Sequence, residues 1–118
     1  MGLLLVATGG CASKTSDVHK PVTASPGDIN VTVNDSFRFS PAHITASPGD
    51  VTLRLVAAGS YPHNIAFPQL HITSTTVGTS VGSARATLVR LHDLRPGVYR
   101  FLCTFHSKAG MTGELVVQ

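Results

Sequence analysis

The stretch that most constrains this chain runs from Cys103 to Met111 and packs three metal-binding side chains into nine residues. A thiol, an imidazole and a thioether follow one another in the spacing Cys-x2-His-x4-Met, with His106 between the two sulfur residues. An apolar and aromatic run at 98–102 precedes the stretch, and a short strand-like tail at 114–118 follows it. We therefore expect the three donors on one loop between the last two strands of a β structure.

This combination of donors indicates copper. A thiolate, two imidazoles and a long, weak thioether bond form the trigonal His2Cys site with an axial Met that holds copper for one-electron transfer. The loop supplies three of these donors, so the second histidine must come from elsewhere in the chain. We assign it to His63, which follows the turn-forming Pro62 and opens an alternating apolar run. The predicted metal ligands are His63, Cys103, His106 and Met111.

The Pro-His-Asn segment at 62–64, followed by the Cys-x2-His-x4-Met loop, resembles the cupredoxins of the plastocyanin and pseudoazurin type. The resemblance covers about 28–118 and is most specific in the ligand loop. It implies a type 1 blue copper protein with one copper per chain, which cycles between Cu(I) and Cu(II). The function that it implies is that of an electron carrier rather than an enzyme.

Two further residues take roles from the same resemblance. Asn64 is similar to the cupredoxin Asn that clamps the two ligand loops together and whose backbone amide faces the Cys sulfur. Phe105 departs from plastocyanins, which usually have Pro two residues after the Cys, and agrees with azurins. A Phe restores the backbone N–H that Pro lacks, so we expect a second hydrogen bond to the thiolate and a preference for Cu(I).

Other interpretations of the same residues have to be weighed. Cys103 alone would be a small buried hydrophobe, or one half of a disulfide with Cys11. A copper chaperone or reservoir could use the same ligands to hold Cu(I) for delivery. A closed zinc site prefers more thiolates than this chain offers. No His-x-His pair occurs, so the trinuclear cluster of a multicopper oxidase is not indicated, and no Gly-x-Ser-x-Gly or phosphate-binding loop suggests another enzyme.

Alternating apolar residues predict an all-β domain, a Greek-key β-sandwich of seven to eight strands. Two strands, at 28–34 and 51–55, are each introduced by the hexapeptide Thr-Ala-Ser-Pro-Gly-Asp, whose Pro-Gly suits a type II turn. A strand at 98–103 would turn Cys103 toward the core with its aromatic neighbours. A single helical turn is allowed within 69–82. The remaining strands are expected at 36–39, 44–46, 63–67, 71–76, 85–91 and 113–118.

The N-terminus indicates export. Residues 1–11 form an apolar run that ends in small residues and Cys11, and it is too short to span a bilayer as a helix. It resembles a signal peptide with the lipobox of bacterial lipoproteins, in which the Cys becomes lipidated. An ordinary cleaved signal is the alternative. Residues 12–27 predict a flexible tether, and 28–118 the copper-binding domain.

These features predict an exported protein, periplasmic or on the outer face of the cell membrane, with a lipid anchor. If Cys11 is lipidated, Cys103 is the remaining thiol, and a metal ligand is the better account of it in an oxidising compartment. The formal net charge is +3, but the nine Lys and Arg form no cluster, so nucleic acid is not an expected partner. We expect a monomer whose redox partner proteins dock transiently near His106, mainly on an apolar surface.

Overall fold

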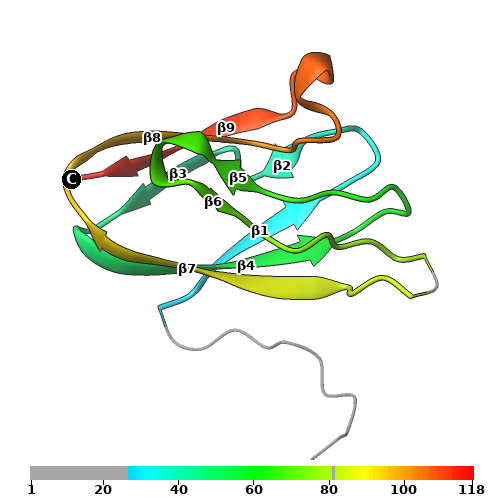
Figure 1. Cartoon of the computed structure of the whole chain (residues 1–118), viewed down its shortest axis with the longest axis horizontal. Helices are drawn as coiled ribbons and strands as arrows, with labels where there is room; N and C mark the ends of the chain where they lie inside the picture. Colours follow the sequence, from blue (N-terminus) through cyan, green and yellow to red (C-terminus); the bar gives the residue numbers. More distant parts are fainter. Residues whose placement is uncertain (1–26, 81) are drawn as a thin grey trace, which may run out of the picture.

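The computed structural model describes residues 27–80 and 82–118, which form two β-sheets packed face to face (Figure 1). One sheet has four strands in the order β2-β1-β4-β7, and the other has five in the order β3-β9-β8-β5-β6. The chain passes repeatedly from one sheet to the other, and the two parallel pairs are β1 with β4 and β3 with β9. The predicted β-sandwich is confirmed. Cys11 and residues 1–26 lie outside the described residues.

The elements of the described residues follow in chain order. They are β1 (Ile29–Val33), β2 (Phe39–Ser40), β3 (His43–Ala46), β4 (Gly49–Ala57), β5 (Ala66–Phe67), the 3-10 turn η1 (Pro68–Leu70), β6 (Ile72–Thr73), β7 (Ala86–Leu94), β8 (Gly97–Leu102), the 3-10 turn η2 (Ser107–Ala109) and β9 (Thr112–Val117).

The core forms between the sheets because apolar residues alternate along the strands. In β8, Phe101 is fully buried and the next inward residue is Cys103, whereas Val98 is half exposed. The ring of Phe101 packs over Gly113, its partner in β9, where a Cβ would overlap the ring. Burial of such an aromatic side chain contributes about 1.5–3 kcal/mol. The predicted inward direction of Cys103 is confirmed, and this packing holds the end of β8 from which the thiol projects.

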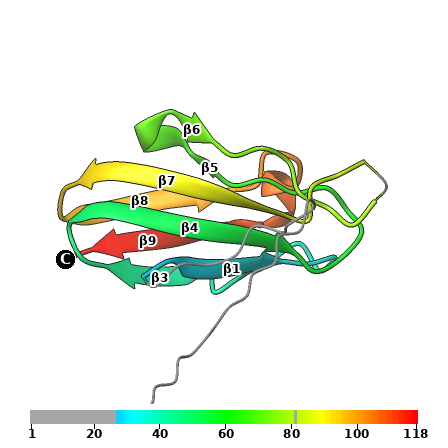
Figure 2. The same cartoon turned by 90° about the horizontal axis from the view of Figure 1, so that it is seen from below.

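The repeated hexapeptide introduces two neighbouring strands. Gly49 adopts φ +113°, the left-handed region that a glycine in this turn allows. β1 and β4 then run parallel and side by side (Figures 1 and 2). Ile29 pairs with Leu53, 24 residues on (53 − 29), whereas the two hexapeptides are 22 residues apart (45 − 23). The repeat therefore predicts the strands but not their register.

Two predicted strands are shorter than expected, near the position of His63. Only Ala66–Phe67 and Ile72–Thr73 of the predicted strands at 63–67 and 71–76 are regular strands. His63 pairs with Val77 in an isolated bridge, and the N–H of Ile65 donates to the Ser74 hydroxyl at 3.0 Å. These contacts satisfy the backbone hydrogen-bonding groups without a continuous strand ladder, because the Ser74 hydroxyl takes the place of a backbone carbonyl as the acceptor for Ile65.

Two turns differ from the predicted elements. The predicted strand at 36–39 begins only at Phe39, because Phe37 closes a turn at positive φ. The helical turn allowed within 69–82 is η1, which begins one residue earlier at Pro68. η2, within the Cys103 to Met111 loop, was not predicted.

Candidate metal centre

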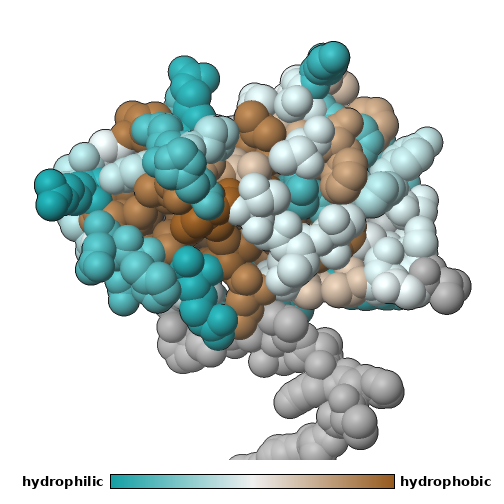
Figure 3. Space-filling view, in the orientation of Figure 1, coloured by the Kyte–Doolittle hydropathy of each residue, from teal (hydrophilic) through white to brown (hydrophobic). Residues whose placement is uncertain are grey.

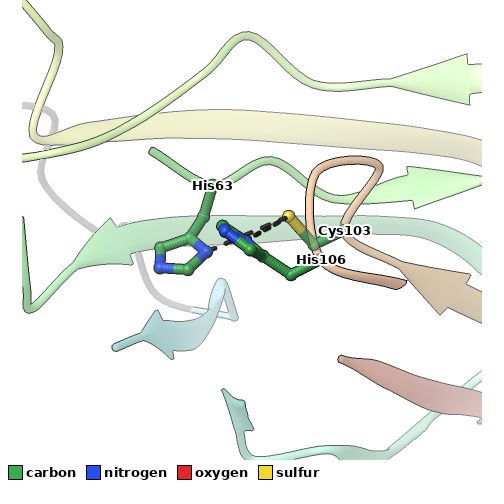
Figure 4. A group of neighbouring side chains, drawn as sticks. All are labelled: His63, Cys103 and His106. Carbon is green, nitrogen blue, oxygen red and sulfur yellow. Dashed lines mark hydrogen bonds between the residues drawn. The ribbon is translucent and has the colours of Figure 1, made fainter. Parts of the chain in front are cut away.

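His63, Cys103 and His106 converge at one end of the sandwich, as the side-chain view in Figure 4 shows. Their ligand atoms all lie within 4.8 Å of one another. The Cys103 Sγ lies 3.9 Å from Nδ1 of His63 and 3.7 Å from Nδ1 of His106. Cys103 is a free thiol and, like His63, is fully buried, whereas His106 is partly exposed. Two imidazole nitrogens thus face one shielded sulfur.

The loop between β8 and β9 folds back on itself, which brings Met111 beside Cys103. The N–H of Cys103 donates to the Met111 carbonyl at 3.1 Å, and the N–H of Met111 donates to the His106 carbonyl at 3.4 Å. The turn η2 and Gly110, at φ +89°, reverse the chain between these residues. Met111 is fully buried. The short Cys-x2-His-x4-Met spacing therefore corresponds to one closed turn.

A pair of hydrogen bonds joins this loop to the segment that carries His63. Asn64 Nδ2 donates to the Thr104 hydroxyl at 2.9 Å, and the Thr104 N–H donates to Asn64 Oδ1 at 2.9 Å. Asn64 is buried, with 5% of its surface exposed. The Asn64 side chain, next to His63, is thus hydrogen-bonded to Thr104, next to Cys103. This is the clamp between the two ligand loops that the resemblance predicted for Asn64. The predicted contact between the Asn64 amide and the sulfur stays a prediction.

Among the described residues, three aromatic rings besides that of His63 pack around His106, and two of them were not predicted. Phe37 stacks on the imidazole, with ring centroids 4.2 Å apart and an interplanar angle of 21°. Tyr61 meets it edge-on at 6.3 Å, and Phe105 lies tilted at 6.3 Å. Phe37 is 69 positions before His106 (106 − 37), and no motif links the two. The second hydrogen bond expected from the Phe105 backbone stays a prediction.

Asp35 ties the turn that holds Phe37 to the segment before His63. Its carboxylate accepts a hydrogen bond from the Tyr61 N–H at 3.1 Å and another from the Ser60 hydroxyl at 3.3 Å. The backbone N–H groups of Tyr61 and then Ser60 lower the pKa of Asp35 below its usual value, because they stabilise the carboxylate. A Cβ at Gly59 would overlap the carboxylate, so a side chain there would displace Asp35 from this position.

The environment of His63 favours the neutral form of its ring. Burial lowers the pKa of His63, and the nearby His106 lowers it further, while Asp35 and the Asn34 carbonyl act in the opposite direction. Its Nε2 is buried and has no hydrogen-bond partner among the described residues. A metal competes with protons for imidazole nitrogen, so a neutral ring is the form that binds.

This lowered pKa predicts that the metal-free domain becomes less stable in acid. Below about pH 6.5 the unfolded chain protonates His63 more readily than the folded chain, so stability is lost as pH falls until the folded pKa is passed. Urea unfolding of the metal-free domain between pH 7.5 and pH 5 measures this loss. His63→Gln should lose less stability over the same range, whereas a change at the exposed His71, His71→Gln, should behave like the wild type. Equal acid losses in the wild type and in His63→Gln would contradict the prediction.

The donors fit a copper ion. Sulfur and imidazole nitrogen that bind one zinc-sized ion, at about 2.3 Å and about 2.0–2.1 Å, lie roughly 3.5–4 Å apart. The observed Sγ to Nδ1 distances of 3.9 and 3.7 Å agree with that separation. One soft thiolate with two imidazoles suits copper, and the shielded pocket limits access of water.

The chain matches the family model of the cupredoxin-like domain over residues 2–117. It belongs to the cupredoxins. This cupredoxin is 31% identical over 96 residues to plastocyanin from Dryopteris crassirhizoma, with 70% of this chain and 90% of the relative covered. It is 30% identical over 87 residues to plastocyanin from Synechococcus sp. (strain JA-2-3B'a(2-13)), where it covers 67% of its own length but only 62% of the relative.

Solved structures agree on the fold of this cupredoxin. The oxidised plastocyanin of Dryopteris crassirhizoma superposes with a TM-score of 0.56 at 25% identity, covering 75% of this chain and 99% of that one. A variant of amicyanin in its reduced Cu(I) form gives a TM-score of 0.62 at 18% identity, covering 80% and 86%. Family and donor set together make copper the cofactor, one ion per chain, and copper-based electron transfer the general role.

The other histidines of the described residues lie on the surface. His43 contacts Glu114 at 3.2 Å and His92 contacts Asp50 at 3.7 Å, while His71 is exposed. Within 27–80 and 82–118, no helix has the length and apolar character that crossing a membrane requires.

Proposed function

We propose that this cupredoxin carries single electrons through a mononuclear type 1 copper site, with His63, Cys103 and His106 as ligands and Met111 as the weak axial donor. The observation that carries the proposal is the convergence of two imidazole Nδ1 atoms on one buried thiol, at 3.9 and 3.7 Å. Copper, when bound, supplies the exchange of one electron between Cu(I) and Cu(II).

The protein's own part is to keep the donors in one arrangement. The hydrogen bonds between Asn64 and Thr104 and the closed turn from Cys103 to Met111 hold the donors close together. A site formed in advance needs little rearrangement when the charge at its centre changes, because its groups are already oriented. Burial of the thiol also keeps water and oxidants from the sulfur.

The alternative is an extracytoplasmic copper chaperone or reservoir that uses the same ligands. It is less favoured, because His63, Cys103 and Met111 are fully buried and a chaperone must hand its ion to another protein. Plastocyanin homologues also support a carrier rather than an enzyme.

Voltammetry of the copper-loaded protein tests the carrier function. We expect a reversible one-electron wave, and Phe105→Pro should lower the potential because it removes the backbone N–H that we expect to donate to the thiolate. A protein that holds Cu(I) without a reversible wave would favour the chaperone. An unchanged or higher potential in Phe105→Pro would remove the proposed role of that N–H.

We also propose that redox partners dock around the exposed edge of His106. Tyr61 and Phe105 are 51% and 52% exposed beside it, and the small Ala109 lies on the same loop with Lys108. Transient redox interfaces are small, so a patch of this kind suffices. In Figure 3 the end that carries the ligand loop, at the upper right, mixes hydrophilic, neutral and pale brown residues. The exposed rings of Tyr61 and Phe105 favour brief, mainly apolar docking.

A charge placed on this patch should slow electron transfer. Ala109→Asp leaves the ligands intact, so we expect an unchanged spectrum and a slower reaction with a redox partner, because a desolvated carboxylate opposes apolar docking. Gly110 is less suitable for the same substitution, because its φ of +89° disfavours any residue with a side chain. Ser47→Asp, at the opposite end of the sandwich, adds the same charge as a control.

Stopped-flow kinetics at about 0.01 and 0.1 M salt, which shortens the screening length from roughly 30 to 10 Å, should show only a modest change in the wild type. A rate that collapses with salt, or that ignores Ala109→Asp, would locate docking elsewhere.

We further propose that the protein is exported and anchored by a lipid on Cys11. The proposal is supported by the apolar run before small residues and a Cys in the sequence. One acyl chain binds membranes only marginally, so the several chains of a bacterial lipoprotein would make the attachment firm. Mass spectrometry of the mature N-terminus tests it, and a soluble protein with an unmodified N-terminus would end this proposal.

A further inference from the structure

Phe37 occupies a backbone conformation that bulky residues rarely adopt. Its φ is +61°, in the left-handed region where glycine and asparagine are the common choices. The turn after β1 requires this conformation: the Phe37 N–H donates to the Asn34 carbonyl at 3.1 Å, and the Ser36 N–H donates to Asn34 Oδ1 at 3.0 Å. A strained residue of this kind persists where its side chain has a use.

The Phe37 side chain contacts both predicted histidine ligands. It lies nearly parallel to the His106 ring, at 4.2 Å and 21°, and edge-on to the His63 ring, at 6.3 Å and 67°. The Tyr61 ring packs against the Phe37 ring with centroids 5.5 Å apart, and Asp35 accepts a hydrogen bond from the Tyr61 N–H. The strained turn therefore places one aromatic ring against the more exposed of the two imidazoles.

We propose that Phe37 is a positioning residue, which holds the His106 imidazole with its Nδ1 toward the Cys103 sulfur. This inference rests on the ligand set of the proposed function. His106 is on a surface loop, and no side-chain hydrogen bond to a polar group other than the Cys103 sulfur is found for its ring among the described residues. The stack limits rotation of the ring and covers one of its faces, so Nδ1 stays directed at the Cys103 sulfur, and copper held there would be released slowly.

A purely structural role for Phe37 predicts something different. If the ring only fills space at the edge of the core, its loss should lower the stability of the domain and leave copper retention unchanged. Phe37→Gly separates the two roles, because glycine accepts the positive φ without strain while it removes the ring. Phe37→Leu removes the stack but keeps an apolar side chain, and Phe37→Tyr keeps the stack.

The experiment follows transfer of Cu(I) from the reduced, copper-loaded protein to excess chelator, beside NMR of the His106 ring protons in the metal-free protein. Phe37→Leu and Phe37→Gly should release copper about two- to tenfold faster than the wild type, the range expected for one aromatic pair. Phe37→Tyr should restore the wild-type rate. The matched control Tyr99→Leu removes a partly buried aromatic ring that, among the described residues, makes no ring contact with His63 or His106, and it should stay close to the wild type.

Two further readouts complete the test. In Phe37→Leu and Phe37→Gly, the His106 ring protons should lose the upfield shift that the stacked Phe37 ring causes. In the metal-free state, Phe37→Gly should unfold at a denaturant concentration no lower than that for Phe37→Leu. Copper release from Phe37→Leu and Phe37→Gly at the rate of Tyr99→Leu, or unchanged His106 shifts in these two variants, would overturn the inference. A wild type that shows no thiolate-to-copper absorption would instead overturn the ligand set.

Discussion

Replacing Cys103 with Ala abolishes the intense visible absorption of the copper-loaded protein. That absorption arises from charge transfer between a thiolate and copper, and Cys103 is the thiol that both imidazoles face, at 3.9 and 3.7 Å. The substitution removes one small buried atom, so the domain should lose only about 1 kcal/mol of stability and remain folded. Absorption and electron paramagnetic resonance spectra of the loaded variant measure the effect.

Met111→Leu is the matched control for this result. Leu and Met have similar volumes, so the swap at this buried position should destabilise the fold by less than about 1.5 kcal/mol. Because it removes only a weak axial donor, the variant should keep copper and its absorption and show a raised potential. A Cys103→Ala protein that stays intensely coloured would mean that the site is assigned to the wrong residues.

Asn64→Ala should loosen the whole site and lower its stability. The substitution removes both hydrogen bonds between Asn64 and Thr104, each 2.9 Å long, which join the His63 segment to the cysteine loop. Loss of a buried polar partner destabilises by about 1–3 kcal/mol, which corresponds to a fall of about 5–20 °C in Tm for a domain of this size. Thermal unfolding of the metal-free protein and the absorption spectrum of the loaded protein measure both effects.

Two variants of Thr104 dissect the clamp. Thr104→Ser keeps the hydroxyl that accepts from Asn64 and should stay near the wild type. Thr104→Val removes the hydroxyl but keeps the backbone N–H that donates to Asn64, so its loss of stability should lie between those of Thr104→Ser and Asn64→Ala. Wild-type stability and an unchanged spectrum in Asn64→Ala would show that the loops are held by other contacts.

The sequence alone predicted the features that depend on local pattern. Cys103, His106 and Met111 are close in the chain, so any tight loop brings them together, and alternation along β8 turns Cys103 inward whatever the partner strands are. The segment carrying His63 and Asn64 is remote from that loop, and it was assigned through the donor count and the family resemblance. The structure places the donor atoms of His63, Cys103 and His106 together, while their role as ligands remains the proposal stated above.

Only the tertiary structure decided what surrounds His106 and how the strands align. The stack of Phe37 on His106 joins loops that belong to different sheets, and no local pattern marks the positive φ that the turn imposes on Phe37. The tie between Asp35 and Tyr61, and the two-residue offset in the pairing of β1 with β4, likewise depend on packing between distant segments. Periodicity reports which face of a strand is buried, but contacts between segments far apart in the chain leave no local pattern, so they become visible only once the two sheets have packed.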